Sequence, residues 1–262
     1  MKYTLITGAS GGIGLELAKL CAKNKHNLIL VARNEKKLQE IKSKLEKEYL
    51  IRAEVIAANL SEVDAAKVLY EKTTSAGYEV NILINNAGYG DHAAFLDSDW
   101  TRQYEMVQLN VTAMMQLTYL YGSDMRKNGS GRILNLSSVA AFSAGPYMSI
   151  YYATKSFVLS FSVSVAEELK GSGVTVTAIC PGPTSTGFES AAQMHGSKMF
   201  TAFKPQSAEA VAKCAYCAMM EGKPLVYHSF ATKFMNVGAR LTTRKFAGRF
   251  AEKINQKPER SS

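Results

Sequence analysis

Short apolar runs alternate with longer segments of helical periodicity along this chain, and this alternation constrains the fold more than any other feature. Apolar runs without a polar side are typical of parallel strands that helices cover on both faces. The alternation therefore predicts a doubly wound α/β fold, with a parallel sheet of about seven strands between two layers of helices. The predicted strands are Tyr3–Thr7, Leu28–Ala32, Ala53–Ala57, Val80–Ile84, Arg132–Leu136, Val174–Ile179 and Leu225–Tyr227. The predicted helices cover residues 12–24, 34–49, 61–76, 99–127, 149–170 and 207–221.

Length and composition fit one large domain with an extension. Of the 262 residues, 47% are hydrophobic and 20% are charged, which excludes a disordered chain. We expect a single domain over residues 1–228 and a basic amphipathic C-terminal extension over residues 229–262. The four cysteines show no pairing pattern and Met1 almost directly precedes a strand, so a cytoplasmic protein is expected.

The net charge of +9 is concentrated near the C-terminus, where nine basic residues stand against two acidic ones from Lys223 onward. Apolar residues are interspersed among these charges, namely Phe234, Val237, Leu241, Phe246, Phe250 and Ile254. Such a segment can lie on a membrane surface, cover a ligand cleft, or pack as a solvated helix on its own domain. It lacks the base-reading groups of a nucleic-acid-binding face, and no nucleic-acid partner is expected.

A glycine-rich segment follows the first predicted strand and leads directly into a helix. It reads Thr7-Gly8-Ala9-Ser10-Gly11-Gly12-Ile13-Gly14. Small residues let the backbone approach a pyrophosphate, and a helix N-terminus offers it free N–H groups. The segment predicts a dinucleotide site; a tight turn without a ligand is the alternative.

Arg33 follows the second predicted strand, where an NAD site usually has an acidic residue that binds the ribose 2′-hydroxyl. A guanidinium suits a 2′-phosphate instead, because it can form paired hydrogen bonds with it. This position favours NADP(H), unless Arg33 is an ordinary solvated charge.

Tyr151 and Lys155 are four residues apart in a predicted helix and share one of its faces. A nearby ammonium favours the phenolate and is expected to lower the tyrosine pKa from about 10. Ser138 follows the fifth predicted strand at the same edge of the sheet, where its hydroxyl could bind a substrate carbonyl oxygen. These three residues predict a site for acid–base chemistry.

Together, these motifs resemble the short-chain dehydrogenase/reductase family, in its single-domain branch, across residues 1–228. The matching residues are Thr7-Gly8-x-x-x-Gly12-x-Gly14, Asn85-Asn86-Ala87-Gly88, Asn110, Ser138, Tyr151-x-x-x-Lys155 and Pro181-Gly182. The resemblance implies a Rossmann-type fold and an oxidoreductase that transfers a hydride between NADP(H) and a carbonyl or alcohol substrate. The alternative is a non-catalytic NADP-binding regulatory or interaction protein with the same fold.

The resemblance also implies roles for individual residues. Tyr151 would donate or accept the proton, Lys155 would hold the nicotinamide ribose, and Ser138 would orient the carbonyl. Asn110 would position a water in a proton relay. The implied cofactor-binding residues are Gly8, Ser10, Gly12, Ile13, Gly14, Arg33, Asn59, Leu60, Asn86, Ala87, Gly88, Tyr151, Lys155, Pro181, Gly182 and Thr186. No metal site is expected.

Two positions depart from the family pattern. Asn59 stands where the family usually has an aspartate that contacts the adenine. Gly11 stands where many NADP-binding members have a basic residue, so Arg33 would bind the phosphate with less help.

Segment 187–206 is expected to form a lid, with Gly187 and Gly196 as hinges and with Phe188, Met194, Met199, Phe200 and Phe203 as apolar side chains. With Phe142 and Tyr147, this composition predicts a pocket for an apolar ketone or aldehyde. The alternative is that these side chains only pack the lid.

The helical segments 149–170 and 104–121 are apolar nearly all round. A sheet covers only one side of a helix, whereas a helix apolar on every side is buried on every side. We therefore expect the two segments to form the subunit interface of a homodimer or homotetramer.

Overall fold

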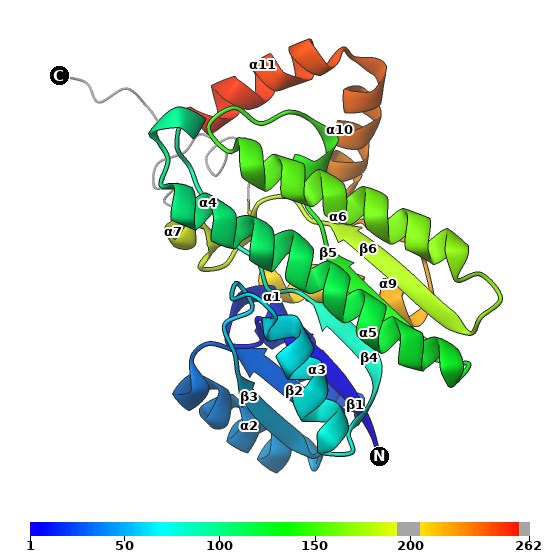
Figure 1. The fold of residues 1–262 in the computed structure, drawn as a ribbon. Coiled ribbons are helices and arrows are strands. Elements are labelled where there is room, and N and C mark those ends of the chain that lie inside the picture. The colour runs from blue at the N-terminus through cyan, green and yellow to red at the C-terminus, as the bar shows by residue number, and fades with distance from the viewer. Residues whose placement is uncertain (193–204, 257–262) are drawn as a thin grey trace.

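The computed structural model describes residues 1–192 and 205–256, in which seven parallel strands form one sheet (Figure 1). The strand order is β3-β2-β1-β4-β5-β6-β9. The strands are β1 Lys2–Thr7, β2 Asn27–Ala32, β3 Ala53–Ala57, β4 Glu79–Asn85, β5 Gly131–Leu136, β6 Val174–Cys180 and β9 Leu225–Tyr227. A separate short pair consists of β7 Thr184–Ser185 and β8 Gln206–Ser207. The predicted Rossmann-type sheet is confirmed.

Helices cover both faces of the sheet, with α1, α2 and α9 on one face and α3, α5 and α6 on the other (Figure 1). The helices are α1 Gly12–Lys23, α2 Glu35–Tyr49, α3 Ala65–Ser75, α4 Trp100–Val107, α5 Met114–Lys127, α6 Ser149–Glu168, α7 Phe188–Ala191, α9 Ala208–Met220, α10 Phe230–Leu241 and α11 Arg244–Asn255. Three shorter segments are η1 Phe95–Asp97, the π-helical η2 Gln108–Ala113, and η3 Val139–Phe142. The two helical layers enclose the two main apolar clusters of the core.

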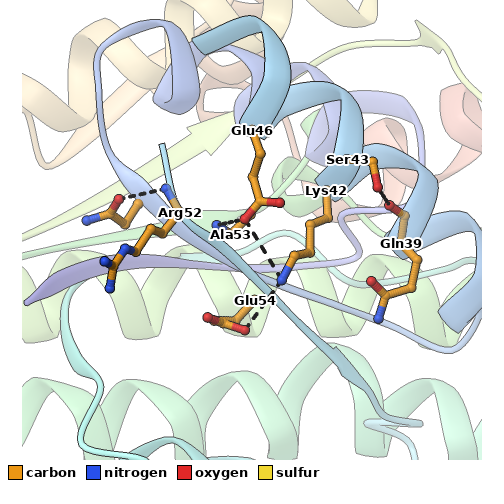
Figure 2. A network of polar contacts seen from close by, with 8 residues as sticks. Gln39, Lys42, Ser43, Glu46, Arg52, Ala53 and Glu54 are labelled. Carbon is orange, nitrogen blue, oxygen red and sulfur yellow. Dashed lines mark hydrogen bonds and ion pairs between the residues drawn. The ribbon is translucent and has the colours of Figure 1, made fainter. Parts of the chain in front are cut away.

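Helix α2 shows how sequence and packing agree. It buries its apolar residues at helical spacing, Leu38, Ile41 and Leu45. On its outer side, Lys42 lies 3.9 Å from a carboxylate oxygen of Glu46 and 3.6 Å from one of Glu54 (Figure 2). The Glu46 carboxylate also accepts a hydrogen bond from the Ala53 N–H at 3.0 Å. These contacts fasten α2 to the edge strand β3.

The ends of β1 and β4 are joined at the point where the strand order reverses. The Thr7 hydroxyl oxygen accepts hydrogen bonds from the N–H groups of Asn86 and Ala87, both at 3.0 Å. The Asn86 side-chain amide donates to Thr7 O at 2.9 Å and to Gly8 O at 3.2 Å. In doubly wound sheets this reversal is where ligands bind, between loops that leave toward opposite faces.

Two helical predictions needed correction. Segment 99–127 is not one α-helix, because the π-helical turn Gln108–Ala113 separates α4 from α5. The C-terminal segment forms two helices, since Thr242 is extended and Thr243 begins a new helix by capping Phe246 N–H. The first break occurs where the apolar spacing continues, whereas the second falls in the five-residue step between Leu241 and Phe246.

The end of α11 is fastened beside the carboxyl edge of the sheet through Asn255, which is fully buried. Its side-chain amide donates to Pro146 O at 2.9 Å and its amide oxygen accepts from the Tyr152 hydroxyl at 3.3 Å. Its backbone oxygen accepts from His92 Nε2 at 2.6 Å. The C-terminal helices are therefore part of the wall next to the site described below. Among the described residues, no helix has the length and apolarity needed to span a membrane.

Candidate active site

A cavity of about 490 Å³ opens at the carboxyl edge of the sheet, bordered by the segments that follow β1, β4, β5 and β6. Most of the predicted site residues line it, namely Gly8, Ser10, Gly12, Ile13, Asn86, Ala87, Gly88, Ser138, Tyr151, Lys155, Pro181, Gly182 and Thr186. The other predicted residues, Gly14, Arg33, Asn59, Leu60 and Asn110, are not part of its lining. The structure thus brings together residues that are up to 178 positions apart in the chain.

The glycine-rich segment is shaped by close packing against β4. A Cβ at Gly14 would lie 2.3 Å from Gly8 O and 2.4 Å from the Asn86 side-chain nitrogen, distances that no side chain tolerates. Gly8 and Gly12 have φ angles of +67° and +53°, which glycine adopts at little cost. Gly14 therefore does not line the cavity, but its lack of a side chain lets α1 pack closely against the loop.

Ser138, Tyr151 and Lys155 lie together on the cavity wall. Tyr151 and Lys155 are 9% and 7% exposed, and the Lys155 ammonium lies 5.7 Å from the centre of the Tyr151 ring. The ammonium donates a hydrogen bond to Leu136 O at 2.9 Å, and the Ser137 hydroxyl donates to Lys155 O at 2.9 Å. The end of β5 thus holds Lys155 both at its ammonium group and at its backbone carbonyl.

The pKa values differ from the sequence-based expectation. Burial raises the pKa of Tyr151 above its usual value near 10, and a hydrogen bond with Ser138 opposes this effect. Burial also lowers the pKa of Lys155 to about 8, an effect that the nearby Cys180 thiol group partly offsets. The prediction that Lys155 lowers the pKa of Tyr151 was wrong, because burial has the larger effect and the ammonium is directed at Leu136 O.

Asn110 lies just behind the cavity, in the π-helical turn. Its side-chain amide donates to Tyr89 O at 2.9 Å and to the Thr154 hydroxyl at 3.2 Å, while its amide oxygen accepts from the Tyr89 N–H at 3.2 Å. A Cβ at Gly88 would lie 2.9 Å from the Asn110 amide oxygen and 3.5 Å from Lys155 Nζ. Asn110 is therefore next to the Lys155 side of the site, and a π-turn at such a position is typical of functional sites.

The cavity fits a dinucleotide. Its volume lies within the roughly 300–1,000 Å³ of ligand pockets. The N-terminus of α1 and three glycines, Gly8, Gly11 and Gly12, border one part of it, where backbone N–H groups can bind phosphate. The loop after β1 would hold the pyrophosphate, and Tyr151 and Lys155 would face the nicotinamide end.

Several residues that were not predicted from the sequence line the cavity. Met148, Tyr152 and Val139 line the cavity, whereas Phe142 packs on Tyr227 and Tyr147 stacks on His92. The predicted pocket roles of Phe142 and Tyr147 were therefore wrong. Phe188 does line the cavity, with its ring centre 5.3 Å from that of Tyr151. The predicted lid residues Met194, Gly196, Met199, Phe200 and Phe203 lie outside the described residues.

A further missed residue is Lys37, whose side chain lines the cavity beside Gly11. Its signal in the sequence is its place in the first turn of α2, four residues after Arg33. Asn59 follows β3, and its amide oxygen accepts hydrogen bonds from the N–H and hydroxyl of Ser61. Arg33 and Asn59 thus stay at the correct edge of the sheet but outside the cavity lining.

Comparisons with known proteins agree with this geometry. A family model described as short chain dehydrogenase matches residues 2–196. Very-long-chain 3-oxoacyl-CoA reductase-A of Danio rerio is 32% identical over 186 residues, which make up 69% of this chain and 57% of that protein. The chain therefore spans little more than half the length of this relative.

Two solved structures are similar over nearly the whole chain. A short-chain dehydrogenase from Sphingobium yanoikuyae in complex with NADPH is 29% identical, with a TM-score of 0.83 and coverage of 92% of this chain and 94% of that one. A bulky-bulky ketone specific alcohol dehydrogenase from Comamonas testosteroni is 28% identical, with a TM-score of 0.78 and coverage of 92% of each chain.

The fold and the site thus define a Rossmann-type domain in which Ser138, Tyr151 and Lys155 share one cavity with a glycine-rich loop. With the family match, the chain belongs to the short-chain dehydrogenase/reductase family. The predicted family is confirmed.

The buried Lys155 gives the folding stability a specific pH dependence. The unfolded chain holds this proton up to the ordinary lysine pKa of 10.5, whereas the folded protein releases it near 8. Between these values the unfolded state binds more protons, so stability rises with pH. We expect the unfolding free energy of the wild type, relative to Lys155→Met, to rise by about 2–3 kcal/mol between pH 7 and 10. Urea unfolding of both proteins measures this difference.

The solvent-exposed Lys213 provides the control. The difference between the wild type and Lys213→Met should not change with pH. A pH-independent difference for Lys155→Met as well would contradict a buried, titrating Lys155.

Proposed function

We propose that the protein is an NADP(H)-dependent reductase of ketones or aldehydes. The observation that carries the proposal is the convergence of Ser138, Tyr151 and Lys155 on the cavity that the glycine-rich loop also borders. The Sphingobium structure, similar over more than nine tenths of both chains, is a complex with NADPH, which supports the cofactor.

The chain's own residues supply the proton for this reaction. When bound, the dinucleotide supplies the hydride that the carbonyl carbon accepts. Burial raises the pKa of Tyr151, so the phenol is protonated at neutral pH and can donate to the carbonyl oxygen. The Ser138 hydroxyl binds the same oxygen, and its hydrogen bond with Tyr151 favours the phenolate that remains. A protonated phenol suits the direction of reduction.

The substrate we propose is large and apolar. Around Tyr151 the cavity is bordered by Val139, Met148, Tyr152 and Phe188, which offer apolar surface. The relatives named above act, by their names, on a very-long-chain 3-oxoacyl-CoA and on bulky-bulky ketones. Small polar carbonyls would leave the apolar wall in contact with water.

Replacing the proton donor tests this function. We expect Tyr151→Phe to lower the rate of NADPH oxidation with apolar ketones by about 10²–10⁴-fold, since it removes only the acidic hydroxyl. NADPH binding, measured by fluorescence titration, should persist. Tyr147→Phe is the matched control, because that ring stacks on His92 outside the cavity lining.

The outcome also decides between the two candidate functions. Wild-type protein that binds NADPH but reduces no member of a carbonyl panel would favour a non-catalytic binding protein. Turnover of small polar carbonyls alone would contradict the apolar substrate.

We also propose that the protein forms a homodimer or homotetramer through α4, α5 and α6. The outer faces of these helices lie side by side (Figure 1) and expose large apolar side chains. These include Trp100, Tyr104, Val107, Met115, Tyr119, Phe157 and Val163. Large exposed apolar side chains on neighbouring helices suit an interaction surface.

Light scattering tests this assembly at micromolar concentration. We expect a mass of two or four times the chain mass of 28.6 kDa. Replacing Tyr119, which is 73% exposed, by Glu should shift the mass toward the monomer, because it places a charge in the apolar contact. A wild-type monomer would refute the proposal.

We also propose that the protein is located in the cytoplasm, which the four unpaired cysteines support.

We further propose that helices α10 and α11 make a peripheral contact with anionic membranes. Asn236 and Asn255 fasten the inner faces of α10 and α11 to the domain. The outer faces expose Phe234, Val237, Leu241, Phe246 and Phe250, together with the cations Lys233, Lys245, Arg249 and Lys253. Apolar residues flanked by basic ones suit an anionic lipid surface, whereas the excess positive charge opposes pairing with a second copy of the same face.

Co-sedimentation with vesicles tests this contact. We expect the wild type to bind vesicles that contain phosphatidylserine, and Phe246→Ser/Phe250→Ser to bind about tenfold more weakly. Leu50→Ser is the control, since Leu50 is exposed at the end of α2, at the opposite end of the molecule from the basic helices (Figure 1). Equal binding to neutral vesicles would contradict the role of charge, and loss of self-association in the double variant would assign this face to a second copy.

A further inference from the structure

Lys37 is the basic side chain that lines the cavity at the glycine-rich loop. A Cβ at Gly11 would lie 3.9 Å from the Lys37 ammonium nitrogen. Apart from the chain neighbours of Gly11, no other atom of the described residues lies within 4 Å of that Cβ position. The ammonium therefore occupies the space beside position 11, next to Ser10 and the N-terminus of α1. A cation placed there faces whatever binds against the loop.

The base of the Lys37 side chain is held firmly. Asn34 caps α2, and its side-chain oxygen accepts a hydrogen bond from the Lys37 N–H at 3.0 Å. Further along α2, Lys42 and Glu46 fasten the helix to β3 (Figure 2). The helix therefore presents Lys37 to the cavity from a fixed first turn, while the flexible methylene chain adjusts the ammonium.

Arg33 is placed differently. Both side chains are exposed, but Arg33 lies at the end of β2 and is absent from the cavity lining, which includes Lys37. The Arg33 charge acts on the Tyr89 phenol, whose pKa it lowers against the larger effect of burial. No ion pair within residues 1–192 and 205–256 involves Lys37, so its charge is available to a ligand.

We propose that Lys37 binds the 2′-phosphate of NADP(H) and sets the preference for it over NAD(H), in place of a basic residue at position 11. The inference rests on the proposed NADP(H) site. A phosphate monoester carries close to two negative charges at neutral pH and accepts hydrogen bonds on three oxygens. The Lys37 ammonium donates to these oxygens, and the Ser10 hydroxyl adds a neutral donor at the same part of the cavity.

A basic side chain at position 11 could replace Lys37 as the cation that binds the phosphate. The Gly11 backbone is extended, with φ −177° and ψ 179°, which any residue adopts. Within the described residues, and apart from its chain neighbours, a Cβ at position 11 would have only the end of the flexible Lys37 side chain within 4 Å. Position 11 can therefore carry the cation when Lys37 does not.

Two fragments of the cofactor isolate the phosphate contact, because 2′,5′-ADP has the 2′-phosphate and 5′-AMP lacks it. By calorimetry, we expect Lys37→Gln to weaken binding of 2′,5′-ADP about tenfold and to leave binding of 5′-AMP unchanged. Lys36→Gln removes the same charge from the preceding, exposed position of α2 and should change neither affinity. Unchanged binding of 2′,5′-ADP to Lys37→Gln, or an equal loss for both fragments, would overturn the proposal.

A second variant tests the exchange of roles. Gly11→Arg in the Lys37→Gln background should restore most of the lost affinity for 2′,5′-ADP. If Arg33→Gln abolishes the preference for 2′,5′-ADP while Lys37→Gln keeps it, the preference belongs to Arg33 and the proposal fails. Wild-type protein that binds neither NADPH nor 2′,5′-ADP would overturn the NADP(H) site itself, a result distinct from failure of the Lys37 contact alone.

Discussion

The hydrogen bonds that join the ends of β1 and β4 determine where this molecule can do chemistry. At the reversal of strand order, the Asn86 N–H donates a hydrogen bond to the Thr7 hydroxyl oxygen, and the Asn86 side-chain amide donates one to Thr7 O. The chain leaves β1 toward one face of the sheet and β4 toward the other, so the loops diverge and a cavity remains between them. Gly14 lets α1 pack directly on this junction, which places the helix N-terminus at the cavity edge.

Much of this arrangement could be predicted because it follows from local patterns. Parallel strands are apolar on both faces, so the strand positions could be read directly from the sequence. Their carboxyl ends share one edge, which brings Ser138 and Tyr151 to the same cavity although neither motif is informative alone. The π-turn around Asn110 could not be predicted, because the apolar spacing of segment 99–127 continues through it.

The missed features depend on packing between distant segments. The sequence places Lys155 one turn from Tyr151 but does not show how deeply either is buried, and burial decides the direction of both pKa shifts. Lys37 approaches Gly11 only after α2 folds against the sheet, so their separation of 26 residues carries no signal. Position 147 is adjacent to Met148, yet Tyr147 turns onto His92 while Met148 enters the cavity wall.

The C-terminal helices connect the molecular surface with the substrate end of the site. Asn255 bonds Tyr152, which lines the cavity beside Tyr151, and its backbone bonds His92. The end of α11 is therefore joined by hydrogen bonds to a side chain of the cavity wall, while α10 and α11 expose apolar and basic residues on their outer sides. A long-chain carbonyl compound partitions into membranes, because each buried methylene contributes about 0.8 kcal/mol. If the proposed membrane contact and the proposed apolar substrate hold, such a substrate can reach the site without moving through water, and this would link the two outer helices to the chemistry at Tyr151.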